Sequence, residues 1–179
     1  MLNDIEKVLI SKEEISNRVK EIANAISNDY KGVEPLFVCI LKGSVFFTTD
    51  LLRSISIPAT IDFMCVSSYG SGTTSSGELK IKKALNESIE GKHVIVVEDI
   101  VDSGNTLYNL KKLLLQRNPA SVKIATLLDK PDRRVADIKA DYCGFVIPDE
   151  FVIGYGLDYA EKYRELPEVC ILKRSVYEK

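Results

Sequence analysis

Two neighbouring carboxylates stand at the end of an apolar run that begins at His93. The run continues through Val97, and Glu98 and Asp99 follow it directly. Carboxylate oxygens suit a magnesium shell or the hydroxyl groups of a ribose. The pair therefore predicts a site for a metal ion, for a sugar, or for both. The structural alternative is that Glu98 and Asp99 only form a solvated strand end.

The following residues, 102–106, are typical of a phosphate-binding turn. Gly104 lets the backbone come close to a ligand, and a helix is expected from about Asn105. Backbone N–H groups and the positive dipole end at a helix N-terminus suit a phosphate dianion. Ser103 and Thr106 add hydroxyl donors. The turn and the carboxylates together fit a ribose 5-phosphate, unless Asp102 or Ser103 simply caps the helix.

Alternating strands and helices must position these residues. Ser11 and Glu14 predict a capping box at the start of the first helix, which runs to about Asn28. Two more helices are expected, from Lys42-Gly43-Ser44 to about Arg53 and from about Asn105 to Gln116. Strands are expected at 36–41, 57–66, 93–97, 122–128, 143–147, 151–153 and 170–173. This order predicts an α/β fold with a mainly parallel sheet, whose ligands bind at the carboxyl ends of the strands.

Five segments resemble one family. Residues 96–107 resemble the motif with which type I phosphoribosyltransferases bind phosphoribosyl pyrophosphate (PRPP). Residue by residue, this segment is similar to the motif of the bacterial hypoxanthine (6-oxopurine) phosphoribosyltransferases. Matching segments extend from about residue 36 to 172 and lie at 41–43, 67–70, 127–131 and 148–159, with Arg164 at the family's spacing. The resemblance implies the type I phosphoribosyltransferase fold over a single domain, 1–179. It implies a small hood of N- and C-terminal segments and a mobile lid at about 67–78.

The resemblance also assigns roles to individual residues. Asp102, Ser103, Gly104, Asn105 and Thr106 would bind the 5′-phosphate of PRPP. Glu98 and Asp99 would face the ribose and a magnesium ion, and Asp158 would reach a second magnesium ion. Lys42, Gly43 and Arg164 would hold pyrophosphate, and Lys130, Phe151 and Val152 would bind the purine. Ser68 and Tyr69 would belong to the lid, and the loop at Lys42 would contain a cis peptide bond.

Each of these positions also has a structural interpretation. Lys42 could be a surface lysine at a helix start, and Lys130 a solvated lysine at a strand end. Phe151 could be a core aromatic, and Asp158 and Arg164 ordinary surface charges. Residues 67–77 lack the Gly-Lys-Ser/Thr ending of a P-loop, but they could be a flexible hairpin loop instead of a lid that excludes water. Agreement with one family pattern favours the functional interpretation.

The expected reaction is transfer of the phosphoribosyl group from PRPP to hypoxanthine, and to guanine as well, giving the nucleotide (IMP or GMP) and pyrophosphate. Asp102 would act as the general base on the purine imidazole. Mg²⁺, Lys42 and Arg164 would neutralise the leaving pyrophosphate. A xanthine- or guanine-preferring enzyme, a PRPP-sensing regulator that binds nucleic acid, and a structural nucleotide-binding module are the alternatives.

Composition narrows the possible partners. The chain carries a formal charge of −2, so no basic surplus indicates a nucleic-acid partner. His93 is the only histidine, which argues against zinc and against Ser-His-Asp chemistry. The cysteines are expected to be inert thiols; they are Cys39, Cys65, Cys143 and Cys170. Neither a signal peptide nor a membrane span is expected, so we predict a cytoplasmic protein. A homo-oligomer, either a dimer or a tetramer, is expected as well.

Overall fold

The computed structural model describes residues 2–68 and 79–178. Its main sheet has the strand order β4-β3-β2-β5-β6-β7. The strands are β2 (Leu36–Ile40), β3 (Thr60–Ser68), β4 (Leu79–Lys83), β5 (His93–Val101), β6 (Ser121–Asp129) and β7 (Tyr142–Val146). Strands β2, β3, β5, β6 and β7 run parallel, and β4 pairs antiparallel with β3. The predicted α/β architecture with a mainly parallel sheet is confirmed.

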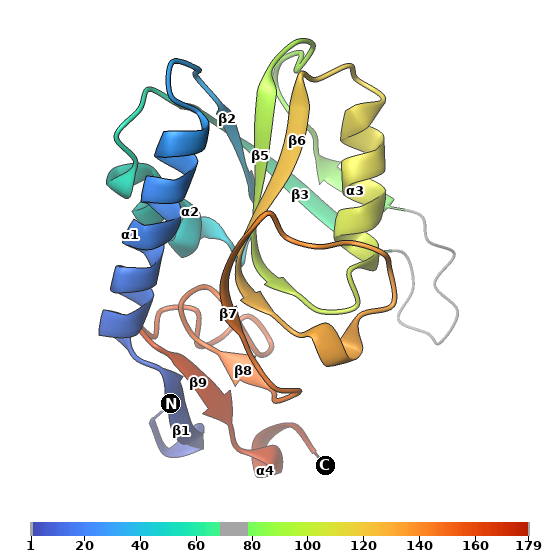
Figure 1. Cartoon of the computed structure of the whole chain (residues 1–179). Helices are drawn as coiled ribbons and strands as arrows, with labels where there is room; N and C mark the ends of the chain where they lie inside the picture. The colour runs from blue at the N-terminus through green and yellow to red at the C-terminus, as the bar shows by residue number, and fades with distance from the viewer. Residues whose placement is uncertain (1, 69–78, 179) are drawn as a thin grey trace.

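Helices cover both faces of this sheet (Figure 1). α1 (Lys12–Asp29) and α2 (Val45–Ser54) pack on one face, and α3 (Asn105–Leu115) packs on the other. Alternate residues of β5 therefore enter two separate cores: Ile95 and Val97 lie with α1 and α2, whereas Val94 and Val96 lie with α3. Burial on both faces explains why the strand is an uninterrupted apolar run.

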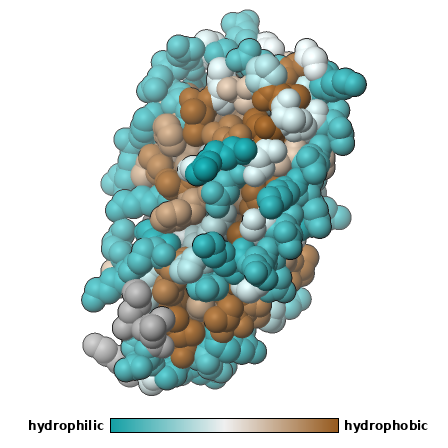
Figure 2. Space-filling view, turned by 90° about the vertical axis from the view of Figure 1, so that its left-hand side faces the viewer, coloured by the Kyte–Doolittle hydropathy of each residue, from teal (hydrophilic) through white to brown (hydrophobic). Residues whose placement is uncertain are grey.

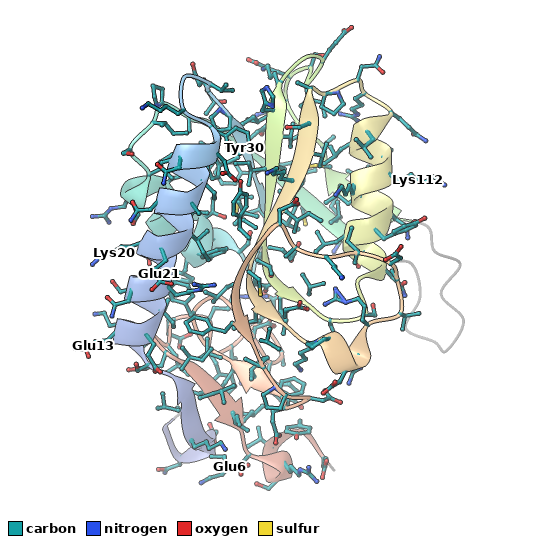
Figure 3. The ribbon with its side chains drawn as sticks, viewed as in Figure 1. Glu6, Glu13, Lys20, Glu21, Tyr30 and Lys112 are labelled. Atoms are coloured by element: carbon teal, nitrogen blue, oxygen red, sulfur yellow. The ribbon has the colours of Figure 1, made fainter. Side chains whose placement is uncertain are left out.

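The predicted capping box at the start of α1 is confirmed. The backbone N–H of Ser11 donates to Glu14 Oε2 at 2.8 Å, and the N–H of Glu14 donates to Ser11 Oγ at 3.3 Å. The predicted apolar face is buried and consists of Ile15, Val19, Ile22 and Ile26. The opposite face is polar, and Glu13, Lys20 and Glu21 point away from the sheet (Figure 3). The two faces fix the side of α1 that packs on the sheet.

A second, smaller sheet forms the hood, with the order β1-β9-β8. Its antiparallel strands are β1 (Ile5–Ile10), β8 (Val152–Ile153) and β9 (Val169–Leu172). The short elements η1 (Leu2–Asp4) and α4 (Arg174–Tyr177) lie at its edge, so segments from both ends of the chain meet below the main sheet (Figure 1). The expected hood of N- and C-terminal segments is present.

Several element boundaries differ from those predicted. β5 continues to Val101, so Glu98 and Asp99 lie inside the strand and not after it, because β5 stays paired with β6 as far as Asp129. β1 and β4 were not predicted: three of the six side chains in β1 and three of the five in β4 are exposed, and charged residues interrupt the apolar pattern of both strands. β3 begins at Thr60 and ends at Ser68, where the backbone pairs with Leu79. Ser68, which was expected in the lid, is the last residue of β3, whereas Tyr69 and the rest of the expected lid, residues 69–78, lie outside the described residues.

Apolar side chains also reach the surface on the side of α1, between polar ones (Figure 2). Phe46, at 43% exposure, is one of the large apolar side chains that lie open. A cavity of about 530 Å³ opens between α1, α2 and residues 155–167, with Phe46 in its wall. In the part of the chain that the structure describes, no helix combines the length and apolarity needed to cross a bilayer.

Candidate active site

The candidate site lies where the direction of the chain connections changes. β2 has β3 on one side and β5 on the other, so the segments that leave β2 and β5 at their carboxyl ends diverge and open a crevice between them. Lys42 and Gly43 follow β2, and residues 102–106 follow β5. The predicted pyrophosphate and phosphate segments therefore share one edge of the sheet.

Gly104 is the N-cap of α3 and has a left-handed backbone with φ 80°. A side chain here would be strained and would meet Ile138, so glycine suits the turn. Neither Asp102 nor Ser103 occupies the cap position, although Ser103 Oγ accepts the N–H of Asn105, the first residue of α3, at 3.4 Å. The turn is fixed by two backbone hydrogen bonds, because the Ser103 carbonyl oxygen accepts the N–H groups of Val135 at 2.9 Å and of Ala136 at 3.0 Å. The N–H groups at the start of α3 are thus presented on a fixed turn.

Glu98 and Asp99 form a partly buried carboxylate pair. Burial raises the pKa of Glu98 well above its ordinary value, and the neighbouring charge of Asp99 raises it further. Burial also raises the pKa of Asp99, whose Oδ1 accepts the N–H of Ile100 at 2.7 Å. Among the described residues Glu98 Oε2 has no hydrogen-bond partner although it is shielded from solvent. Such an arrangement is costly in the free protein and indicates that the pair serves a ligand.

Two glycines bring the segment after β2 against the hood and against β5. A side chain at Gly43 would overlap the Asp99 carboxylate, and one at Gly156 would overlap the Gly43 carbonyl oxygen. The backbones at Gly43 and Gly156 therefore touch, which glycine at position 156 allows, whereas the atoms nearest to Gly43 on the β5 side belong to the Asp99 side chain. The peptide bond between Leu41 and Lys42 is cis, as the resemblance implied. Gly156 was not singled out in the sequence.

Charged side chains gather beside Lys42 and Gly43. Lys42 Nζ donates to Glu161 Oε2 at 2.9 Å, and Arg164 Nη2 lies 2.7 Å from Asp158 Oδ1 and 3.4 Å from Glu161 Oε2. The lysine ammonium, followed by the arginine, lowers the pKa of Glu161. The three residues predicted here, Lys42, Asp158 and Arg164, come together. Glu161 was missed, because nothing in its local sequence shows that it joins two cations.

A cavity of about 380 Å³ adjoins Asp102. Its wall includes Lys130 and Phe151, which the resemblance assigned to the purine, together with Val152. Lys130 is 8% exposed, and its Nζ donates to the Glu150 carbonyl oxygen at 2.6 Å. The structure therefore brings together the general base and the purine-binding residues that the sequence predicts.

Phe151 is a partly exposed ring at the border of this cavity rather than a core aromatic. It is 37% exposed and stacks on Tyr177 of α4, with the ring centroids 4.8 Å apart and the planes at 23°. The Tyr159 ring meets it edge-on at 5.6 Å. Because Tyr177 covers one face of Phe151, a flat ligand could stack only on the other face. No sequence signal pointed to Tyr177, since its contact depends on how the C-terminal segment returns to the hood.

Two more residues in this wall were not anticipated. Arg133, in η2 (Pro131–Arg133), places Nε 2.7 Å from Asp102 Oδ1. Asp149 lies 3.4 Å from Arg133 Nη1 and 3.7 Å from Lys130 Nζ. The carboxylates of Asp102 and, next, Asp149 raise the pKa of the Arg133 guanidinium.

The six-stranded sheet, the predicted phosphate turn after its central strand β5 and the small antiparallel hood together are the fold of the phosphoribosyltransferase class. Residues 10–160 match the model of the phosphoribosyl transferase domain family, and the chain belongs to this family. It is 53% identical to the hypoxanthine-guanine phosphoribosyltransferase of Bacillus subtilis, over 99% of each chain. The crystal structure of a hypoxanthine phosphoribosyltransferase from Staphylococcus aureus covers all of this chain, with a TM-score of 0.97 and 50% identity; the match spans 97% of the crystallised chain.

A longer relative contains the same domain. The bifunctional protein TilS/HprT of Listeria monocytogenes is 54% identical over 99% of this chain, which spans 27% of that protein's length.

Proposed function

We propose that the protein transfers the phosphoribosyl group of PRPP to hypoxanthine and guanine, as part of purine salvage. One observation carries the proposal: Asp102 borders both the phosphate turn at the start of α3 and the cavity that contains Lys130 and Phe151. A ribose 5-phosphate in the turn and a base in the cavity would therefore meet beside one carboxylate. The names and the degree of identity of the relatives support the same substrates.

The base is held by three contacts. Phe151 stacks on it with the face that Tyr177 leaves open, and Lys130 donates a hydrogen bond to the 6-oxo group. Backbone carbonyls near Val152 and Asp158 read the 2-amino group of guanine. Hypoxanthine lacks that group, so both bases are accommodated by contacts that every side chain would permit.

The chemical step exchanges two bonds at ribose C1. The bond from C1 to the pyrophosphate oxygen breaks, and the bond from C1 to a purine ring nitrogen forms. The Asp102 carboxylate takes the proton that the imidazole ring of the base releases. Lys42 and Arg164 stabilise the charge that grows on the departing pyrophosphate. Both cations contact Glu161 in this structure, and the pyrophosphate replaces that carboxylate.

The carboxylates fit Mg²⁺ as the cofactor. Glu98 carries a buried oxygen without a partner, and Asp99 lies against Gly43 in the pyrophosphate segment. Among the described residues no three metal-binding side chains converge on one point, which suits an ion that retains water and substrate oxygens. When bound with PRPP, Mg²⁺ supplies charge neutralisation for the leaving group. Glu98 and Asp99 would face the ribose hydroxyls, and Asp158 the metal on the pyrophosphate side.

The test is pyrophosphate release from Mg·PRPP with each of four bases. We expect turnover with hypoxanthine and guanine, and turnover with adenine at the level of a reaction without base. Xanthine distinguishes the runner-up, since a higher kcat/KM for xanthine than for hypoxanthine would replace the substrate assignment. Absence of release with all four bases would refute the proposed activity.

A further inference from the structure

Four side chains of alternating charge line one wall of the base cavity. Arg133 Nε lies 2.7 Å from Asp102 Oδ1, and Arg133 Nη1 lies 3.4 Å from Asp149 Oδ1. The same oxygen of Asp149 is 3.7 Å from Lys130 Nζ. The row thus connects the residue proposed as proton acceptor with the residue proposed to bind the 6-oxo group. The reaction as described above uses only the two end members.

The backbone builds an arch that holds Arg133 over Asp102. One foot of the arch is Lys130, whose N–H donates to the Val101 carbonyl oxygen at 2.9 Å. The other foot is Val135, whose N–H donates to the Ser103 carbonyl oxygen at 2.9 Å. These two hydrogen bonds attach residues 130–135 to the residues immediately before and immediately after Asp102. The arch between them therefore keeps a fixed position relative to the Asp102 carboxylate, which the Arg133 side chain contacts.

The contact does little for stability but can do much for catalysis. The side chains of Arg133 and Asp102 are 51% and 46% exposed, and an ion pair that exposed contributes at most about 1 kcal/mol. Asp102 Oδ1 is nevertheless shielded from solvent, and it accepts no well-formed hydrogen bond from the described residues. The guanidinium is then the group that sets its place. Misplacing a reacting group by about 1 Å can cost about 10²-fold in rate.

We propose that Arg133 is a positioning residue for the phosphoribosyl transfer. It holds Oδ1 of Asp102 so that Oδ2 faces the base and takes the imidazole proton, while Asp149 anchors the guanidinium from the other side. The proton moves from the ring nitrogen to Oδ2, and the pyrophosphate leaves with both electrons of its bond to C1. This inference rests on the proposed function and on Asp102 as its general base.

The test compares Arg133→Gln, Arg133→Lys and Arg117→Gln. The control position Arg117 is an exposed arginine beyond the far end of α3, so Arg117→Gln removes the same charge away from the site. We expect Arg133→Gln to lower kcat about tenfold with the KM for PRPP changed less than about twofold, since only the proton acceptor is disturbed. Arg133→Lys should recover part of the loss, and Arg117→Gln should match the wild type.

A double-mutant cycle with Asp102→Asn separates this role from a structural one. If Arg133 acts through Asp102, Arg133→Gln should cause no further loss in the Asp102→Asn background. Radiolabelled hypoxanthine and long incubations keep that low residual activity measurable. An equal loss in both backgrounds, or a raised KM for PRPP with unchanged kcat, would overturn the inference. Should the wild type form no nucleotide, or should Asp102→Asn turn over normally, the proposed function or its base assignment fails first and the inference falls with it.

Discussion

At the scale of single residues, the site is a set of charged side chains that contact protein groups in the free protein, in the places where the proposed function puts groups of the substrates. Lys42 and Arg164 contact Glu161, and Lys130 contacts the Glu150 carbonyl oxygen. Each of these three groups therefore already contacts an acceptor before a ligand arrives, although Arg164 Nε has no partner among the described residues. The net binding free energy per contact is therefore smaller than it would be for a charged group without a partner. Selectivity then depends on how well the substrate replaces the protein group as acceptor.

Asp102→Asn should reduce kcat by about 10²-fold or more, because the amide cannot accept the imidazole proton. The KM for PRPP should change little, since the N–H groups of the phosphate turn remain in place. Steady-state kinetics with hypoxanthine measures both constants. Asp132→Asn, an equal charge change on the exposed part of η2, is the control and should behave as the wild type. Turnover of Asp102→Asn near that of the control would remove Asp102 from the base role.

Lys130 should make the enzyme choose 6-oxo over 6-amino purines, because an ammonium group donates hydrogen bonds and cannot accept them. Replacing it in Lys130→Ala should lower kcat/KM for hypoxanthine about tenfold to a hundredfold, the usual contribution of a hydrogen bond to a charged group. Competition between hypoxanthine and adenine, followed by chromatography of the nucleotides, is the measurement. Efficient use of adenine by the wild-type protein would contradict this assignment.

At the scale of elements, the capped helix α1 is the best example of structure encoded locally. Ser11→Ala removes the hydroxyl that accepts the backbone N–H of Glu14 and donates to the Glu14 carboxylate. The variant should therefore have a free energy of unfolding that is lower by about 1 kcal/mol. Ser16→Ala changes an exposed serine within the same helix and is the matched control. Urea denaturation of both variants tests the difference. Equal midpoints would mean that tertiary packing alone fixes the start of α1.

Elements of the parallel sheet could be predicted because burial on both faces leaves an apolar run, as in β5. β1 and β4 could not, since an exposed edge strand takes its structure from its partner and not from its own pattern. The site divides in the same way. Asp102 lies in a contiguous motif, whereas Arg133 and Tyr177 reach their partners through tertiary contacts that no spacing in the sequence records.

At the scale of the whole molecule, the carboxylate pair in β5 trades stability for function. Burial and Asp99 raise the pKa of Glu98, so between the unfolded and the folded pKa the native state holds a proton that the unfolded chain releases. The free energy of unfolding contributed by this group is therefore full at low pH and is lost as pH rises through the folded pKa.

Glu98→Gln removes this loss because its side chain is neutral at every pH. In the absence of ligands it should be more stable than the wild type by about 1 kcal/mol or more, with a larger difference at pH 8 than at pH 5. Urea melts at the two pH values measure this, and PRPP titrations should show weaker use of Mg·PRPP by the same variant. A wild-type protein whose stability exceeds that of Glu98→Gln at pH 8 would contradict the assignment.

The pairing of β1 with β9 has a consequence for synthesis on the ribosome. β1 is made long before its hydrogen-bond partner, Val169–Leu172, because about 160 residues separate the two strands in the sequence. The parallel strands β2, β3, β5, β6 and β7 all lie within residues 36–146, so they can pair with one another while β1 waits as an unpaired strand. Gly156, Asp158 and Arg164 also follow the parallel strands in the sequence, so the side of the crevice that is proposed to bind pyrophosphate is completed after the sheet. A nascent chain stalled before residue 150 should therefore hold the phosphate turn, but neither the hood nor a functioning catalyst.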